Sequence, residues 1–102
     1  MKKAQSIFPF DCSLTGPNYD FKGQILNMSQ NGFICNTGVQ VVRTGTTLAA
    51  KFSLPLTSKQ LEVNVMAFKT YDKFKGAHGS VNPGDHITEF VYKSPVQILK
   101  RH

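Results

Sequence analysis

The chain carries the stretch Asn27-Met28-Ser29-Gln30-Asn31-Gly32 between two apolar runs, residues 19–26 before it and residues 33–35 after it. Asn and Ser have short polar side chains that can bond nearby backbone groups and hold a tight bend. Gly32 can adopt a positive φ, which costs free energy in any residue with a Cβ. Asn-Gly between apolar runs is also a strong hairpin signal. The stretch 27–32 therefore predicts a bend between two strands.

This bend has two interpretations. It brings backbone N–H groups, an amide and a hydroxyl together, and such a cluster can cradle an anion or bind the edge of a base. A plain turn without a ligand explains the same six residues, since short motifs often match by accident. The six residues alone leave both interpretations open.

Length and composition indicate one globular domain over residues 1–102. Hydrophobic residues make up 40% of the chain, and its net charge is +6, from 12 Lys and Arg against six Asp and Glu. This charge favours an anionic partner: a nucleotide, a nucleic acid, a membrane surface or an acidic protein patch. The lysines are dispersed along the chain, which also fits a solvated surface.

Cysteine usage and hydropathy indicate the compartment. Cys12 and Cys35 are the only cysteines, and no CxxC pair exists. No apolar run approaches the length that spans a membrane. Residues 1–6 begin like a signal peptide, but they lack a long apolar stretch behind them, because Pro9 and Asp11 interrupt it. We therefore expect a soluble cytoplasmic chain with reduced thiols and no membrane insertion.

Period-2 alternation predicts six strands, over residues 7–14, 19–26, 32–36, 46–54, 61–71 and 86–92. The run 61–71 loses its alternation at residues 65–68, which predicts a bulge or a barrel corner. Ser94 and Pro95 suit the start of a short C-terminal helix. These elements predict an all-β fold, a small six-stranded antiparallel β-barrel or split sandwich with a C-terminal helix.

The alternation also predicts the barrel interior. The inward-facing set is Phe21, Ile25, Leu48, Phe52, Val63, Val65 and Phe90. Aromatic residues on strand patterns are expected in the core rather than as base-stacking platforms, because Phe is usually buried. The phenylalanines concerned are Phe8, Phe10, Phe21, Phe33, Phe52, Phe68 and Phe90.

The order of these elements resembles the PilZ domain, a bacterial receptor module for cyclic di-GMP. The signature of that family is Asp or Asn, any residue, Ser, any two residues, then Gly, and Asn27, Ser29 and Gly32 match it. The resemblance covers roughly residues 8 to 99. It implies a non-enzymatic, cytoplasmic signalling module that binds this nucleotide and relays the signal to a partner protein.

The second PilZ motif, Arg-x-x-x-Arg ahead of the first strand, is absent. The equivalent stretch holds Lys2 and Lys3, and the first Arg of the chain is Arg43. Arg bonds an oxyanion bidentately and stacks flat on a base, whereas Lys offers only a point charge. The resemblance therefore implies weak nucleotide binding. Asn27 and Ser29 would contact a guanine or phosphate, Gly32 would let the backbone approach, and Lys2 and Lys3 would neutralise phosphate charge.

The sequence contains no pattern typical of metal binding or catalysis. His78, His86 and His102 have no metal-ligand spacing, and no acid–base pair or nucleophile can be assigned. We therefore expect no catalytic residues, no metal, no cofactor and no enzymatic activity. Two alternatives to nucleotide reception remain. One is a degenerate PilZ domain that acts as a protein-interaction adaptor, and the other is a small basic barrel that binds nucleic acid.

Overall fold

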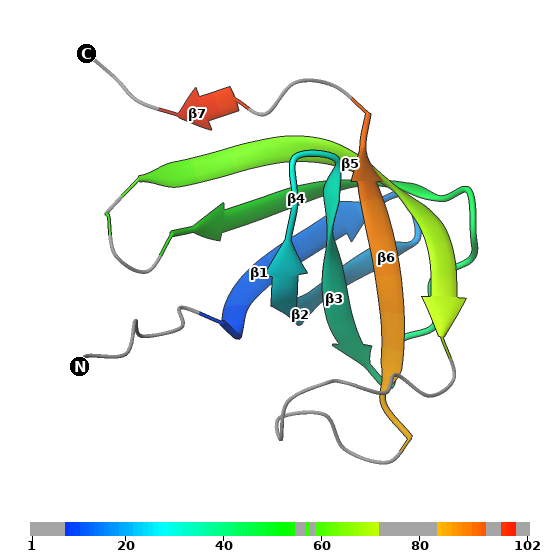
Figure 1. Ribbon diagram of the computed structural model, residues 1–102. Helices are drawn as coiled ribbons and strands as arrows, with labels where there is room; N and C mark the ends of the chain where they lie inside the picture. Colours follow the sequence, from blue (N-terminus) through cyan, green and yellow to red (C-terminus); the bar gives the residue numbers. More distant parts are fainter. Residues whose placement is uncertain (1–7, 55–56, 58, 72–83, 94–96, 100–102) are drawn as a thin grey trace, which may run out of the picture.

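The computed structural model describes residues 8–54, 57, 59–71, 84–93 and 97–99 (Figure 1). The described residues contain strands and no helix. The strands are β1 (Phe10–Gly16), β2 (Tyr19–Met28), β3 (Gly32–Gly38), β4 (Thr47–Ser53), β5 (Gln60–Tyr71), β6 (His86–Tyr92) and β7 (Gln97–Leu99).

Strands β1 to β6 close into an antiparallel barrel. The strand order is β4-β1-β2-β3-β6-β5, and β5 pairs back with β4. Closure leaves these six strands paired on both sides over most of their length, which removes exposed sheet edges. The predicted all-β, six-stranded antiparallel barrel is therefore confirmed.

The predicted C-terminal helix is wrong for the part of it that the structure describes. Residues Gln97–Leu99 form β7, which pairs antiparallel with the start of β5, at Gln60 to Glu62. The reason is an open sheet edge, because β6 pairs with β5 only from Val65 onward. Strand addition there supplies backbone hydrogen bonds, whereas an eight-residue helix is marginal in water. The other residues of that helix lie outside the described residues.

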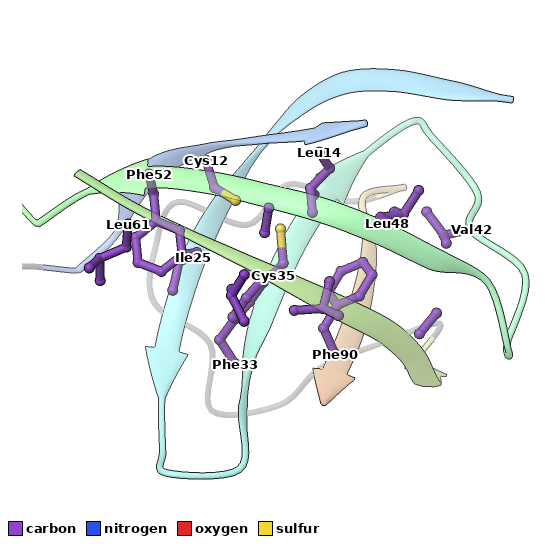
Figure 2. Packing of buried hydrophobic residues seen from close by; sticks show 14 of the residues in the cluster. Cys12, Leu14, Ile25, Phe33, Cys35, Val42, Leu48, Phe52, Leu61 and Phe90 are labelled. Atoms are coloured by element: carbon purple, nitrogen blue, oxygen red, sulfur yellow. The ribbon is translucent and has the colours of Figure 1, made fainter. Parts of the chain in front are cut away.

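The core lies inside the barrel, where the inward side chains of all six strands meet (Figure 2). Of the predicted interior set, only Phe21 is partly rather than fully buried. Phe33 is central: the centroid of its ring lies 5.5 Å from the ring centroid of Phe90 and 6.1 Å from that of Phe52. Aromatic pairs at this spacing add to the stabilisation from buried area. The core residues are Phe10, Cys12, Leu14, Ile25, Phe33, Cys35, Val42, Leu48, Ala50, Phe52, Leu61, Val63, Val65, Ala67 and Phe90.

The predicted irregularity in residues 65–68 is a β-bulge. The pairing of β5 with β6 shifts register between Ala67 and Lys69. Ala67 is fully buried, while Phe68 is 54% exposed. The prediction that Phe68 belongs to the core is therefore wrong, because the extra residue of a bulge falls outside the alternation of the ladder.

Both cysteines are free and buried in the barrel core. Burial, with a smaller effect from the charge of Asp11, raises the pKa of the Cys12 thiol from 9.0 to about 12. Burial, with a smaller effect from Cys12, raises the pKa of Cys35 well above its ordinary value. A raised pKa in the folded state means that the folded chain retains protons which the unfolded chain loses above pH 9.

The buried thiols predict a loss of stability in alkali. Stability should be unaffected by them below pH 9 and should fall from pH 9 towards pH 12. The expected loss between pH 8 and pH 10 is about 1.4 kcal/mol for each thiol, since the unfolded thiol ionises across that range. Urea unfolding at the two pH values measures it, with the Cys12→Ala/Cys35→Ala double variant as control. An equal pH dependence in the double variant would contradict the prediction.

Candidate functional site

The bend between β2 and β3 is held by its own polar groups. The Ser29 N–H donates to the Gly32 carbonyl at 2.9 Å, and the Ser29 hydroxyl donates to the same oxygen at 3.5 Å. The Asn31 N–H donates to Ser29 Oγ at 3.2 Å. The Met28 N–H donates to Asn27 Oδ1 at 2.9 Å. The predicted local bonding of Asn27 and Ser29 is confirmed, and both side chains lie at the solvent-facing end of the two strands.

Gly32 is needed for a reason other than a positive φ. Among the described residues, positive φ angles occur at Gly38, Gly45 and Gly84 and not at Gly32. A Cβ on Gly32 would instead collide with the carbonyl oxygen of Phe90 and lie 2.8 Å from the Cα of Val91. Gly32 therefore does not use the positive φ that a glycine permits, and close packing against the β6 backbone excludes a side chain here.

The structure brings the three signature residues together in one cavity. Asn27, Ser29 and Gly32 line a hollow of about 150 Å³ between the bend and the end of β6. Lys2 and Lys3 lie outside the described residues. Among the described residues, the lining consists of Asn27, Met28, Ser29, Asn31, Gly32, Phe33, Ile34, Glu89, Phe90 and Val91.

Glu89 is the charged residue of this lining, and the sequence did not predict it as a site residue. It reaches the cavity because β6 pairs with β3, with Glu89 opposite Ile34. Its Oε1 accepts a hydrogen bond from the Tyr71 hydroxyl at 3.1 Å. Partial desolvation, and then the hydrogen bond and charge of Glu89, raise the pKa of Tyr71. No local sequence signal links Glu89 to the bend, because only strand pairing places them together.

The cavity suits hydrogen bonding better than charge pairing. Asn27, Ser29 and Asn31 offer amide and hydroxyl groups, which can bond the polar edge of a base. Among its described lining residues there is a carboxylate and no cation. A phosphate group at this place would therefore need positive charge from elsewhere in the chain.

Metal-binding clusters and membrane-spanning helices are both absent from the described part of the chain. There, no group of three or more His, Cys, Asp or Glu side chains is placed to hold a metal ion. Within the same residues, no helix is long and apolar enough to cross a membrane.

The chain was compared with known proteins in three ways. No protein-family model matches it, no curated protein matches it, and no solved structure matches it. Its function is therefore inferred from the residues of the bend, the barrel around them and the cavity that they line.

Proposed function

We propose that this chain is a non-enzymatic bacterial signalling module of PilZ type. It binds cyclic di-GMP weakly at the β2–β3 bend and relays the signal to a partner protein. The observation that supports this most is the gathering of Asn27, Ser29 and Gly32 around one cavity of a closed antiparallel barrel. In this proposal the amide of Asn27 and the hydroxyl of Ser29 bond a guanine edge or a phosphate.

Two features make the proposed binding weak. The paired arginines of the PilZ motif are absent, and each charge-assisted contact contributes about 1.5–3 kcal/mol, so the loss is on the order of a hundredfold or more in affinity. The carboxylate of Glu89 in the cavity lining adds repulsion towards phosphates. Lys2 and Lys3 would provide the compensating charge, with an affinity that falls as salt rises.

Glu89 also favours the second candidate, a degenerate PilZ domain that has lost the nucleotide and acts as a protein-interaction adaptor. An anion site seldom keeps a carboxylate in its lining unless a cation offsets it. A nucleic-acid-binding barrel has less support. Among the large apolar residues that the structure describes, Phe68 is the one exposed aromatic, and single-strand binding uses several stacking rings.

Calorimetric titration with cyclic di-GMP tests the proposal. We expect weak, salt-sensitive binding by the wild type and at least about a fivefold loss in Ser29→Ala, which removes one hydrogen bond of the site. Glu89→Gln should bind about fivefold more tightly, because it removes about 1 kcal/mol of repulsion and keeps the acceptor for Tyr71. Glu62→Gln, the same charge change outside the cavity, is the matched control and should leave the affinity unchanged.

Two results would overturn nucleotide reception. If the wild type shows no heat at millimolar nucleotide, the adaptor candidate replaces it. If Ser29→Ala binds as tightly as the wild type, the bend is not the site.

Substituting Arg at two positions, Lys3→Arg and Ile7→Arg, restores the spacing of the PilZ motif. We expect a gain in affinity for cyclic di-GMP on the order of a hundredfold. A folded double variant without that gain would show that the site lies elsewhere.

A further inference from the structure

A second, larger cavity lies at the opposite end of the barrel from the bend. It has a volume of about 440 Å³ and is lined by Val41, Val42, Arg43, Thr44, Thr70, His86 and Thr88. The loop that links β3 to β4 supplies the first four residues, and β5 and β6 supply the others. Because β3 and β6 run antiparallel, Gly32 faces the end of β6 and Gly38 faces its start at His86 (Figure 1). We call this cavity the barrel mouth.

The barrel mouth adjoins the barrel interior. Side chains two residues apart share a face of a strand, so His86 and Thr88 point to the same side as Phe90, which is fully buried in the core. Thr70 is paired directly with Thr88 and therefore lies on that face too. Val42 of the β3–β4 loop belongs to the buried core cluster and also lines the mouth. Mouths of β-barrels are recurrent places for small-molecule sites, and this volume is in the usual range.

The lining of the mouth is cationic and rich in hydroxyl groups. Arg43 is exposed, and Thr44, Thr70 and Thr88 each supply a hydroxyl. The described lining contains no carboxylate, in contrast to the cavity at the bend, which contains Glu89. Asp85, the acid next to His86, is not part of the lining and accepts a hydrogen bond from Asn36 Nδ2 at 2.9 Å.

The buried hydroxyl of Thr88 also points to a ligand, independently of the charge of Arg43. Its side chain is 0% exposed, and its Oγ1 is the buried side-chain polar atom of the described residues that has no hydrogen-bond partner. Buried hydroxyl groups almost always have a partner, and one without a partner carries a desolvation cost. A bound acceptor group would meet this need.

We propose that the barrel mouth binds the phosphate group of a small phosphorylated molecule or free phosphate. Arg43 supplies the bidentate charged contact, and the Thr88 hydroxyl donates a hydrogen bond. The guanidinium fork matches two oxygens of a phosphate, and the remaining oxygens accept from hydroxyl donors. The site is separate from the bend and does not depend on cyclic di-GMP binding there.

Titration followed by amide chemical shifts tests this site on the full chain. The probes are inorganic phosphate and ribose 5-phosphate, with sodium chloride holding the ionic strength constant. We expect shifts concentrated at residues 41–45, 70 and 86–88. Tighter binding of ribose 5-phosphate would assign the site to an organic phosphate, and equal binding would assign it to free phosphate. Shifts spread over the lysines, with no concentration at the mouth, would overturn the proposal.

Two variants assign the roles. Arg43→Gln should weaken phosphate binding at least tenfold, whereas Lys51→Gln, the same charge change outside the mouth, should change it less than about twofold. Equal losses of phosphate affinity in these two variants would overturn a specific site.

Thr88→Val removes the hydroxyl at nearly constant shape. It should melt at the same temperature as the wild type or higher, yet bind phosphate at least threefold more weakly. Wild-type affinity in Thr88→Val would overturn the role of this hydroxyl. The amide shifts of residues 27–32 should stay unchanged in the phosphate titration, which separates this test from that of the bend.

Discussion

Gly32→Ala is expected to lower the free energy of unfolding by about 3 kcal/mol, the upper part of the usual range for overpacking. The added Cβ would overlap the carbonyl oxygen of Phe90, and backbone atoms of a paired strand cannot move aside as a flexible side chain can. The bend would have to shift away from β6, which also opens the cavity lined by Asn27 and Ser29. Urea unfolding monitored by circular dichroism measures the change.

Gly38→Ala is the matched control for this substitution. Gly38 has a φ of +65° and nothing within 4 Å of an added Cβ, so its substitution meets backbone strain without a collision. We expect a cost of about 1–2 kcal/mol, the usual cost of a left-handed conformation in a residue with a Cβ. A Gly32→Ala cost no larger than that of Gly38→Ala would contradict the role of close packing at Gly32.

Phe90→Ala is expected to cost about 4 kcal/mol, because it empties the centre of the barrel. Phe90 is fully buried and its ring packs 5.5 Å from that of Phe33. For a domain of this size, such a loss corresponds to a fall in melting temperature of roughly 15–30 °C. Phe90→Leu removes less volume and should lie between the wild type and Phe90→Ala.

Phe68→Ala makes the same chemical change at the bulge of β5. Phe68 is 54% exposed, so its substitution should change the free energy of unfolding by less than about 1 kcal/mol. Thermal melts of both variants decide the comparison. Similar losses at Phe90 and Phe68 would show that the bulge does not turn Phe68 out of the core.

Features encoded within a few neighbouring residues were predictable from the sequence. The strand runs follow from period-2 alternation, and the bulge follows from its loss at residues 65–68. The bend followed from Asn27, Ser29 and the Asn-Gly pair, because the side-chain hydrogen bonds that hold it all lie within residues 27–32. Of the candidate site, the three signature residues could therefore be placed together, because they belong to one turn.

The closure of the barrel, the collision that excludes a side chain at Gly32, and the exposure of Phe68 were decided by tertiary structure. Tertiary structure also placed the carboxylate of Glu89 beside the bend and put Arg43 and Thr88 in the lining of one cavity, the barrel mouth. Strand β7 replaced the expected helical geometry at Gln97–Leu99, because an edge of β5 was open there. The physical reason is the same in each case. Alternation and turn chemistry depend on a few adjacent residues. The pairing partner and the register of each strand depend instead on the free energy of the whole closed sheet.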